Sequence, residues 1–468
     1  MYNAKKIVCA ASALALSFSA AACSSGSKDS SSVYKEKVKI EDTDTIAPIP
    51  EGAETELEWL SYFDINPSKN SQEKRVDLSL FEKKGGSIKY SATSSMTKYD
   101  QLANRLLSND PPDLFWFEQK MTFPCYCIKG MFQPVDEIVD FDQSLWSEVK
   151  PIADEFVLKG EHYVCPIETG SLITLTYNKD FIEANALSDP YDLYMEGNWT
   201  WNEWYDLMDE YCSGAQGEES RYGINGWFAP FVFHSTGKTL INYDAEKDEY
   251  VSNIDDPDFD RASDLLYDIQ KNNLYYQDWI GSATDAFKKN ILFYAMGTWA
   301  VTPKEGDNWG MVPMPRDPNT DEYYTSLSIT AYMWVKGSQK SDAVKCWYEC
   351  ARTAATDPVY KEQGKEKLFV SQPYWTEEMY DMSCVEPTTE KYNKIVDPGY
   401  GISTLLSNDD AANTPTKEAV IAYMYSSVMK SDDDGVQFTW AKLRETYRST
   451  IDSELKDFNE EYHKFINQ

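Results

Sequence analysis

Two pairs of an aromatic residue and a carboxylate stand close together in the sequence, Tyr62 with Asp64 and Trp116 with Glu118. Each pair ends a short apolar segment that has the pattern of a strand. Sugars present flat C–H faces and a rim of hydroxyl groups, which suit an aromatic ring and a carboxylate respectively. The two pairs are therefore candidates for contacting a polyhydroxylated ligand. The alternatives are that Trp116 caps a hydrophobic core and that Tyr62 and Asp64 lie in a solvated turn before Pro67.

Patterns for catalysis or metal binding are weak in this chain. The sequence contains no nucleophile elbow, P-loop or dinucleotide-type glycine pattern. The 77 acidic residues supply many carboxylate pairs, but such pairs in a sequence carry no geometry. Only three histidines occur, and neither Cys125-Tyr126-Cys127 nor Cys346/Cys350 is a CxxC motif. We therefore expect no catalytic residue, no metal and no cofactor.

Strands alternate with helices along most of the chain. Strands are expected at 57–62, 87–90, 113–117, 172–177, 311–314 and 329–335. Helices are expected at 71–84, 99–108, 200–211, 258–271, 341–351, 417–429 and 440–465. This alternation predicts an α/β fold with a mostly parallel sheet, in which ligands bind beyond the carboxyl ends of the strands. The two aromatic–carboxylate pairs stand at such ends.

The first 22 residues have the composition of an export signal. Lys5 and Lys6 precede an apolar run of small residues that is too short for a permanent membrane span. The segment Ser19 to Cys23 resembles a bacterial lipobox, with Ala20 where leucine is usual. Residues 1–22 are therefore predicted to be a signal peptide and Cys23 to be the lipidated N-terminus, with ordinary cleavage as the alternative. The serine-rich stretch within residues 23–53 is predicted to be a polar tether.

Length and charge restrict the class of protein further. More than 400 residues remain after the tether, which exceeds what one hydrophobic core usually supports, so two lobes are expected. The formal net charge of −33 argues against a nucleic-acid partner and against adhesion to an anionic membrane surface. Without Cys9 and Cys23, seven cysteines remain, an odd number that cannot all pair.

Four segments carry a resemblance to a known family. Residues 160–181 contain Gly-Glu-His-Tyr-Val-Cys-Pro-Ile and later Tyr-Asn-Lys-Asp-Phe, similar to the family's "GKxYGxP…YNKDLF" segment. Residues 102–114 resemble its helix, "GDxPD" turn and strand. Residues 285–299, which end in Ala-Met-Gly-Thr-Trp, resemble its "F..GkaAM...g.W" stretch. Residues 309–315 resemble a strand near its hinge. In this order, the segments resemble the family 1 extracellular solute-binding proteins of ABC importers, the maltose-binding-protein-like group.

The resemblance implies a two-lobe periplasmic-binding-protein-like fold of type II, with a mixed sheet flanked by helices in each lobe and a hinge that the chain crosses several times. The implied first lobe comprises 54–168 and 312–356, and the second comprises 169–311 and 357–468. It also implies capture of a solute between the lobes and delivery to ABC permease subunits. The protein is then expected to be a monomer at the outer face of the bacterial cell membrane, attached only through its lipid.

Further candidate ligand contacts come from the resemblance. Glu168 lies in the segment that passes between the lobes, and a hinge loop without ligand contact is the alternative. Trp227, Phe228 and Trp299 lie in segments that border the family's cleft in the second lobe. Tyr400 is a candidate from the helical C-terminal region.

The sequence leaves the ligand open. A mono- or oligosaccharide is the expected ligand, while a polyol, a phosphorylated glycerol or a peptide remains an alternative because binders of all of them share the fold. Two other classes of protein are also considered: a glycan-binding surface module not coupled to transport, and a glycan-active enzyme.

Overall fold

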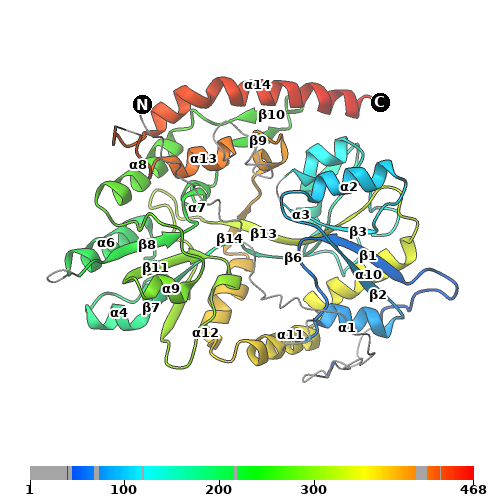
Figure 1. Cartoon of the computed structure of the whole chain (residues 1–468), viewed down its shortest axis with the longest axis horizontal. Helices are drawn as coiled ribbons and strands as arrows, with labels where there is room; N and C mark the ends of the chain where they lie inside the picture. Colours follow the sequence, from blue (N-terminus) through cyan, green and yellow to red (C-terminus); the bar gives the residue numbers. More distant parts are fainter. Residues whose placement is uncertain are drawn as a thin grey trace, which may run out of the picture. The chain divides into compact units, whose positions relative to one another are not determined.

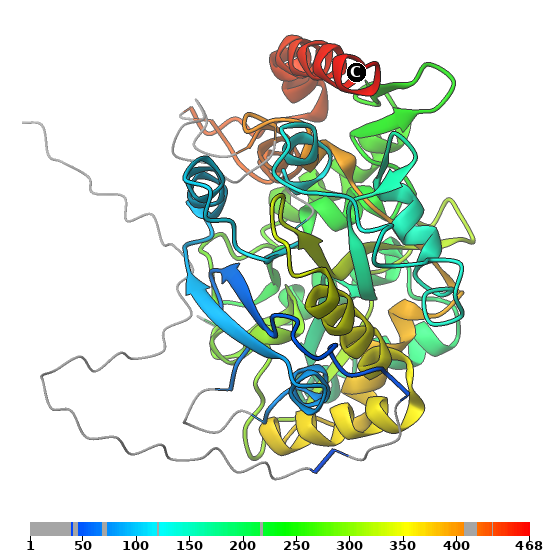
Figure 2. The same ribbon diagram turned by 90° about the vertical axis from the view of Figure 1, so that its right-hand side faces the viewer.

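The computed structural model describes residues 39–40, 45–67, 73–118, 121–215, 219–406, 419–432 and 434–468. The predicted signal peptide, the lipidation site Cys23 and the first part of the tether lie outside the described residues. Within those ranges, none of the helices is both long enough and apolar enough to cross a membrane. Figures 1 and 2 show the chain from two directions.

The first sheet is built from six strands in the order β14-β13-β3-β1-β2, with β6 also paired to β13. Its strands are β1 (Glu56–Ser61), β2 (Ser87–Ala92), β3 (Leu114–Trp116), β6 (Cys165–Ser171), β13 (Tyr323–Trp334) and β14 (Tyr392–Ile395). Strands β2 and β3 run parallel to β1, whereas β13 runs antiparallel to β3 and β6. The sheet is therefore mixed, as the family resemblance implies.

The second sheet has the order β12-β7-β11-β8. Its strands are β7 (Thr174–Asn178), β8 (Tyr222–Gly226), β11 (Ile291–Met296) and β12 (Trp309–Val312). Strand β8 is parallel to β11, and β7 is antiparallel to both β11 and β12. All six residues of β11 are buried, so this strand shows no alternation of polar and apolar residues, and the sequence pattern did not predict it.

Two hairpins and a set of helices complete the described part of the chain. The hairpins are β4 (Val157–Leu158) with β5 (Glu161–His162) and β9 (Ile241–Asp244) with β10 (Glu249–Ser252). The α-helices are α1 (Val76–Lys83), α2 (Lys98–Leu107), α3 (Lys150–Ala153), α4 (Lys179–Ala184), α5 (Pro190–Met195), α6 (Trp201–Ser213), α7 (Ala229–His234), α8 (Pro257–Lys271), α9 (Ala283–Phe287), α10 (Ser341–Thr356), α11 (Pro358–Ser371), α12 (Glu377–Tyr380), α13 (Val420–Ser427) and α14 (Trp440–Ile466). Short 3₁₀ and π turns connect several of them.

Most predicted helices are confirmed, and their ends follow local chemistry. The side chain of Asp256 accepts a hydrogen bond from the amide of Asp258 at the start of α8, and Thr439 caps α14 in the same way. Helix α1 begins at Val76 rather than at 71, because Arg75 has the extended backbone of a residue that precedes a helix. Helix α14 lies along the β9–β10 hairpin (Figures 1 and 2).

Alternating side chains of the first sheet enter two different cores. Trp59 and Leu114 pack into the core beneath α1 and α10, while Leu60 and Phe115 pack with Leu102 of α2. Both faces of the sheet are thus covered by helices, which explains why both Trp59 and Leu60, neighbours in β1, are fully buried. Polar side chains follow β1 and β3 at their carboxyl ends.

The chain passes between the two sheets several times. Strand β6 ends at Ser171 in the first sheet, and β7 begins at Thr174 in the second. Strand β12 of the second sheet precedes β13, which pairs with β3 at one end and with β14 at the other. The predicted multi-crossing connection follows from this topology, whereas the residue numbers predicted for the lobe boundaries remain predictions.

Candidate functional site

A cluster of polar and aromatic side chains lies at the carboxyl ends of β1 and β3. Lys98, the first residue of α2, forms an ion pair with Glu118. The Lys98 ammonium also lies 5.4 Å from the ring centroid of Tyr62 and 5.0 Å from that of Tyr99. Tyr62 is 38% exposed. The structure therefore brings Tyr62 and Glu118 to one place through a lysine that the sequence analysis did not select.

Asp64 has a local role in the structure. One of its oxygens accepts hydrogen bonds from both the backbone and the side-chain nitrogen of Asn66, each at 2.9 Å. This is the arrangement of an Asx turn, and the Asp64 side chain is exposed. Ligand contact by Asp64 remains a prediction.

Trp116 is half-buried in an aromatic cluster. Its ring meets Trp59, Phe63 and Tyr332 edge-on, with centroid separations of 6.0, 5.4 and 5.7 Å. These contacts fix the orientation of the indole. The expected ligand platform is therefore also part of the packing around β1 and β13.

Three tryptophans gather at the carboxyl ends of β8 and β11 in the second sheet. Trp227 directly follows β8, and its backbone amide donates to the carbonyl of Ala295 in β11. Trp299 follows β11 and is 59% exposed. Trp279 is 51% exposed and lies in a loop that Asn225 of β8 holds, because its amide group donates to the carbonyl of Asp278 at 2.9 Å.

Two glycines set the positions of these tryptophans. At Gly226, where φ is +112°, a Cβ would lie 2.1 Å from the carbonyl oxygen of Ala295, so only glycine lets the chain turn into Trp227. A Cβ on Gly297 would lie 2.0 Å from the ring of Trp299. The Trp299 indole therefore rests directly on the backbone at the end of β11.

Two other predicted contacts are buried. Phe228 is fully buried and packs edge-on against Trp204 and Tyr275, so it belongs to the core beneath the second sheet. Tyr400 is 8% exposed, and its carbonyl accepts a hydrogen bond from the amide of Met121. Neither ring is presented to solvent, and both predicted contacts would require these side chains to become exposed.

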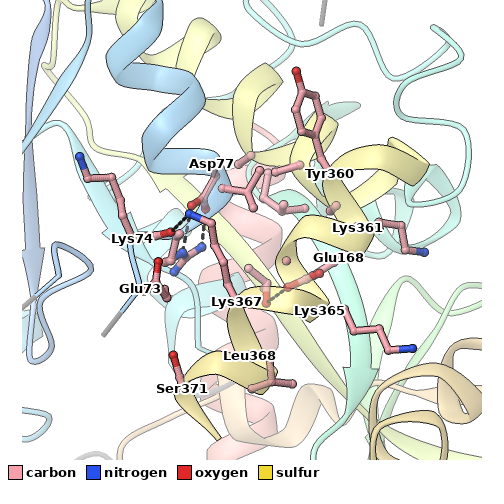
Figure 3. A pocket seen from close by; sticks show the side chains of 18 of the residues that line it. Glu73, Lys74, Asp77, Glu168, Tyr360, Lys361, Lys365, Lys367, Leu368 and Ser371 are labelled. Carbon is pink, nitrogen blue, oxygen red and sulfur yellow. Dashed lines mark hydrogen bonds and ion pairs between the residues drawn. The ribbon is translucent and has the colours of Figure 1, made fainter. Parts of the chain in front are cut away.

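Glu168 lines a pocket of about 420 Å³ between the amino end of α1, strands β6 and β13, and helix α11 (Figure 3). One of its oxygens accepts a hydrogen bond of 3.4 Å from the hydroxyl of Thr330. The side chain is accessible to solvent but lies in a concave site, and desolvation raises the pKa of its carboxyl, while the nearby Arg75 opposes the shift. Its proton therefore binds more tightly than that of an ordinary glutamate.

The rest of this pocket is rich in charged groups that are held in place. The guanidinium of Arg75 pairs with both oxygens of Asp77, including an Nε–Oδ1 contact of 3.0 Å. Lys367 donates to the carbonyl of Lys74 at 2.7 Å. Carboxylates and guanidinium groups fixed in this way suit recognition of hydroxyl groups, because their donors and acceptors are already oriented.

Lys98, Arg75, Asp77 and Trp279 were not predicted from the sequence. Lys98 and Arg75 begin or precede helices whose capping signals are weak. Trp279 lies outside the motifs that support the family resemblance. An inventory of aromatic residues between the expected elements would have found Trp279, whereas no local pattern distinguishes the charged residues from the many others.

The comparison with protein families decides the class of this protein. The family described as "Bacterial extracellular solute-binding protein" matches residues 79–356. The chain belongs to this family. No curated protein matches it in sequence.

Solved structures share its fold. The ABC substrate-binding protein Lmo0181 from Listeria monocytogenes, in complex with cycloalternan, has a TM-score of 0.56 at 16% identity over 88% of this chain and 99% of that one. The galacto-N-biose-/lacto-N-biose I-binding protein from Bifidobacterium longum, in complex with lacto-N-biose, has a TM-score of 0.60 at 14% identity, covering 87% and 99%. UgpB from Mycobacterium tuberculosis, in complex with glycerophosphocholine, has a TM-score of 0.58 at 12% identity, covering 86% and 99%.

These findings confirm the family resemblance and the two-lobe α/β fold that the motifs predicted. As a member of this family, the chain is a solute-binding protein rather than an enzyme.

Proposed function

We propose that this solute-binding protein is a lipid-anchored receptor that captures a mono- or oligosaccharide between its lobes and delivers it to ABC permease subunits. The observation that carries the proposal is the set of partly or well exposed indoles, Trp227, Trp279 and Trp299, at the carboxyl ends of β8 and β11. Apolar side chains exposed together at one place mark a binding surface, and sugar rings are ligands that stack on indoles. The protein acts as a monomer at the outer face of the membrane.

The first sheet offers the complementary polar groups. Tyr62, Lys98 and Glu118 lie together beyond β1 and β3, and Glu168 with the Arg75–Asp77 pair lies near the crossing strands. A closed ligand site needs such oriented donors and acceptors, because each buried sugar hydroxyl must be hydrogen-bonded. The ligands in the complexes of the structural neighbours include cycloalternan and lacto-N-biose, which favours a saccharide, and glycerophosphocholine, which keeps a phosphorylated glycerol as the second candidate.

A thermal-shift screen identifies the ligand class. The mature protein is heated with a panel of mono- and oligosaccharides, polyols, peptides and glycerophosphodiesters. A ligand at 100 times its Kd adds about 2.7 kcal/mol to the free energy of unfolding, which produces a clear rise in Tm. Stabilisation by glycerophosphodiesters or peptides alone would contradict the saccharide proposal. Importer permease genes beside this gene would favour transport over a stand-alone glycan-binding module.

Ligand binding is expected to close the lobes. A ligand that contacts both lobes binds the closed state more tightly than the open one, and this difference in binding free energy stabilises the closed state. Changes in a few backbone dihedrals of the hinge are enough for the motion. Small-angle scattering should therefore give a smaller radius of gyration with saturating ligand than without it. An unchanged profile with a ligand confirmed by the thermal-shift screen would reject closure.

The replacement Cys23→Ala is expected to release the protein from the membrane fraction. The thioether-linked lipid at Cys23 would be the only attachment, and removing the sulfur removes the site of lipidation. Fractionation of cells that express the wild type and Cys23→Ala, followed by immunoblotting, measures the effect, and a Cys9→Ala variant is the control. A Cys23→Ala protein that stays in the membrane fraction would reject the anchor.

A further inference from the structure

Trp279 is exposed although the loop that carries it is attached to the second sheet at several points. The loop comprises residues 275–282, directly before α9, and Trp279 is 51% exposed. Ile280, the next residue, is only 5% exposed. The loop therefore places one of these two apolar side chains in the core and presents the other to solvent.

Asn225 of β8 holds the part of the loop that precedes Trp279. Its amide group donates hydrogen bonds to the carbonyl of Tyr276 at 2.7 Å and to the carbonyl of Asp278 at 2.9 Å. The backbone amide of Tyr276 also donates to the carbonyl of Ile224 at 3.0 Å. The chain is therefore fixed beside β8 up to the residue before Trp279.

Tyr294 of β11 holds the part of the loop that follows Trp279. Its hydroxyl group donates to the carbonyl of Ile280 at 2.9 Å. Tyr294 and Asn225 are partners in the parallel pairing of β11 with β8. Two neighbouring residues of the sheet thus fix the chain on both sides of Trp279.

Neither of these two residues is exposed to a ligand. Asn225 is 1% exposed and Tyr294 is fully buried. The side-chain oxygen of Asn225 has no hydrogen-bond partner among the described residues, so the hydrogen bonds that its side chain makes there all go to the loop. Any effect of Asn225 or Tyr294 on ligand binding must therefore act through the loop and its exposed indole.

We propose that Asn225 and Tyr294 are positioning residues of the saccharide site, and that they hold Trp279 in the orientation in which its ring contacts the sugar. This inference rests on the proposed function. An indole that is already fixed loses little conformational freedom when a sugar stacks on it, so a rigid loop strengthens binding without adding a contact of its own.

Hydrogen exchange of the unliganded protein tests the positioning without a ligand. Asn225→Leu and Tyr294→Phe remove the donors and nearly keep the shape of each side chain. Mass spectrometry should show the backbone amides of residues 275–282 exchanging at least about threefold faster in both variants, because the loop opens more often. Asn253→Leu is the matched control, since the amide group of Asn253 donates to the carbonyl of Thr239 at 2.9 Å, outside this loop. Unchanged exchange in the first two variants would overturn the proposal.

Calorimetry then tests the contact with the sugar. The probe is the sugar that raises the Tm most among glucose, galactose, maltotriose, cellotriose, xylotriose and lacto-N-biose. Trp279→Ala should lower the affinity at least about fivefold, because a stacking face is lost. Asn225→Leu should lower it at least about threefold in the wild type but less than about twofold in the Trp279→Ala background, since its effect passes through that ring.

The outcomes separate this inference from the proposed function. Binding of a sugar with wild-type affinity by Trp279→Ala would overturn the role of Trp279 and leave the saccharide function standing. Independent losses that add in the double variant would also overturn the proposal, because Asn225 would then act by another route. Absence of a Tm rise with every sugar in the set would reject the proposed function and this inference together. Tyr294→Phe keeps the buried ring, so the test stands even if Asn225→Leu folds poorly.

Discussion

Replacement of Trp299 by alanine is expected to weaken binding of the identified saccharide about 5- to 150-fold while leaving the Tm of the unliganded protein almost unchanged. Loss of one aromatic platform removes about 1–3 kcal/mol of binding free energy, because the sugar face loses its apolar contact. The Trp299 ring is 59% exposed, so little core packing is lost. Calorimetry with the ligand and thermal melting without it measure the two effects separately.

Gly297→Ala is a companion to this variant. It retains the indole but places a Cβ 2.0 Å from the present ring position, so the ring must move. If Trp299 is a platform, affinity should fall in both variants. Wild-type affinity in Trp299→Ala would show that this ring does not contact the ligand and would weaken the case for a saccharide.

Trp116→Ala is expected to behave differently from Trp299→Ala. The sequence treats both as platforms, but Trp116 packs against Trp59, Phe63 and Tyr332. Its removal should therefore lower the Tm of the unliganded protein as well as the affinity, since the loss of a well-packed tryptophan costs up to about 3–5 kcal/mol of stability. An unchanged Tm together with lost affinity would mean that Trp116 contributes to ligand binding but not to the stability of the aromatic cluster.

Asp113→Ala is expected to destabilise the protein by about 3–5 kcal/mol. The Asp113 side chain is 3% exposed, and one oxygen accepts hydrogen bonds from the amide of Glu58 at 2.7 Å and from Lys340 at 2.8 Å. The other accepts from the hydroxyl of Ser338 at 2.7 Å. Alanine would leave three donors, one of them charged, without this acceptor. Chemical denaturation followed by fluorescence measures the change.

Asp64→Ala is the control for Asp113→Ala. Asp64 is also an aspartate near the end of a strand of the first sheet, but it is exposed and bonds only to Asn66 among the described residues. Its replacement should cost no more than about 1 kcal/mol. Equal losses in the two variants would contradict the view that Asp113 ties β1, β3 and the start of α10 together.

The local sequence predicted the helices that have both a capping residue and regularly spaced apolar residues. The helix expected at 440–465 is α14, because Thr439 caps it and apolar residues recur along its length. The helix expected at 258–271 is α8 for the same reason, with Asp256 as its cap. Strand β11 was missed because its six apolar residues are buried on both faces and show no period.

The candidate site was predicted only in part. Tyr62 and Glu118 were found because the carboxyl ends of adjacent parallel strands meet at one edge of a sheet. Their link, Lys98, comes from helix α2, and nothing near Lys98 in the sequence marks it for this position. Phe228 looked like Trp227 in the sequence, but the turn into α7 directs Phe228 into the core.

The sequence by itself determined the family, the alternation of strands and helices and the strand ends from which ligand contacts emerge, because these depend on motifs and on periodicity within short segments. The tertiary structure alone decided which of the candidate aromatic rings are exposed and can contact a ligand. Trp116 and Trp299 differ in exposure because β3 lies beside β13 and its aromatic neighbours, whereas the chain after β11 places Trp299 over a glycine at the surface. The tertiary structure alone also placed Lys98 beside Glu118 and Tyr62, since helix α2 meets the ends of these two strands only on folding.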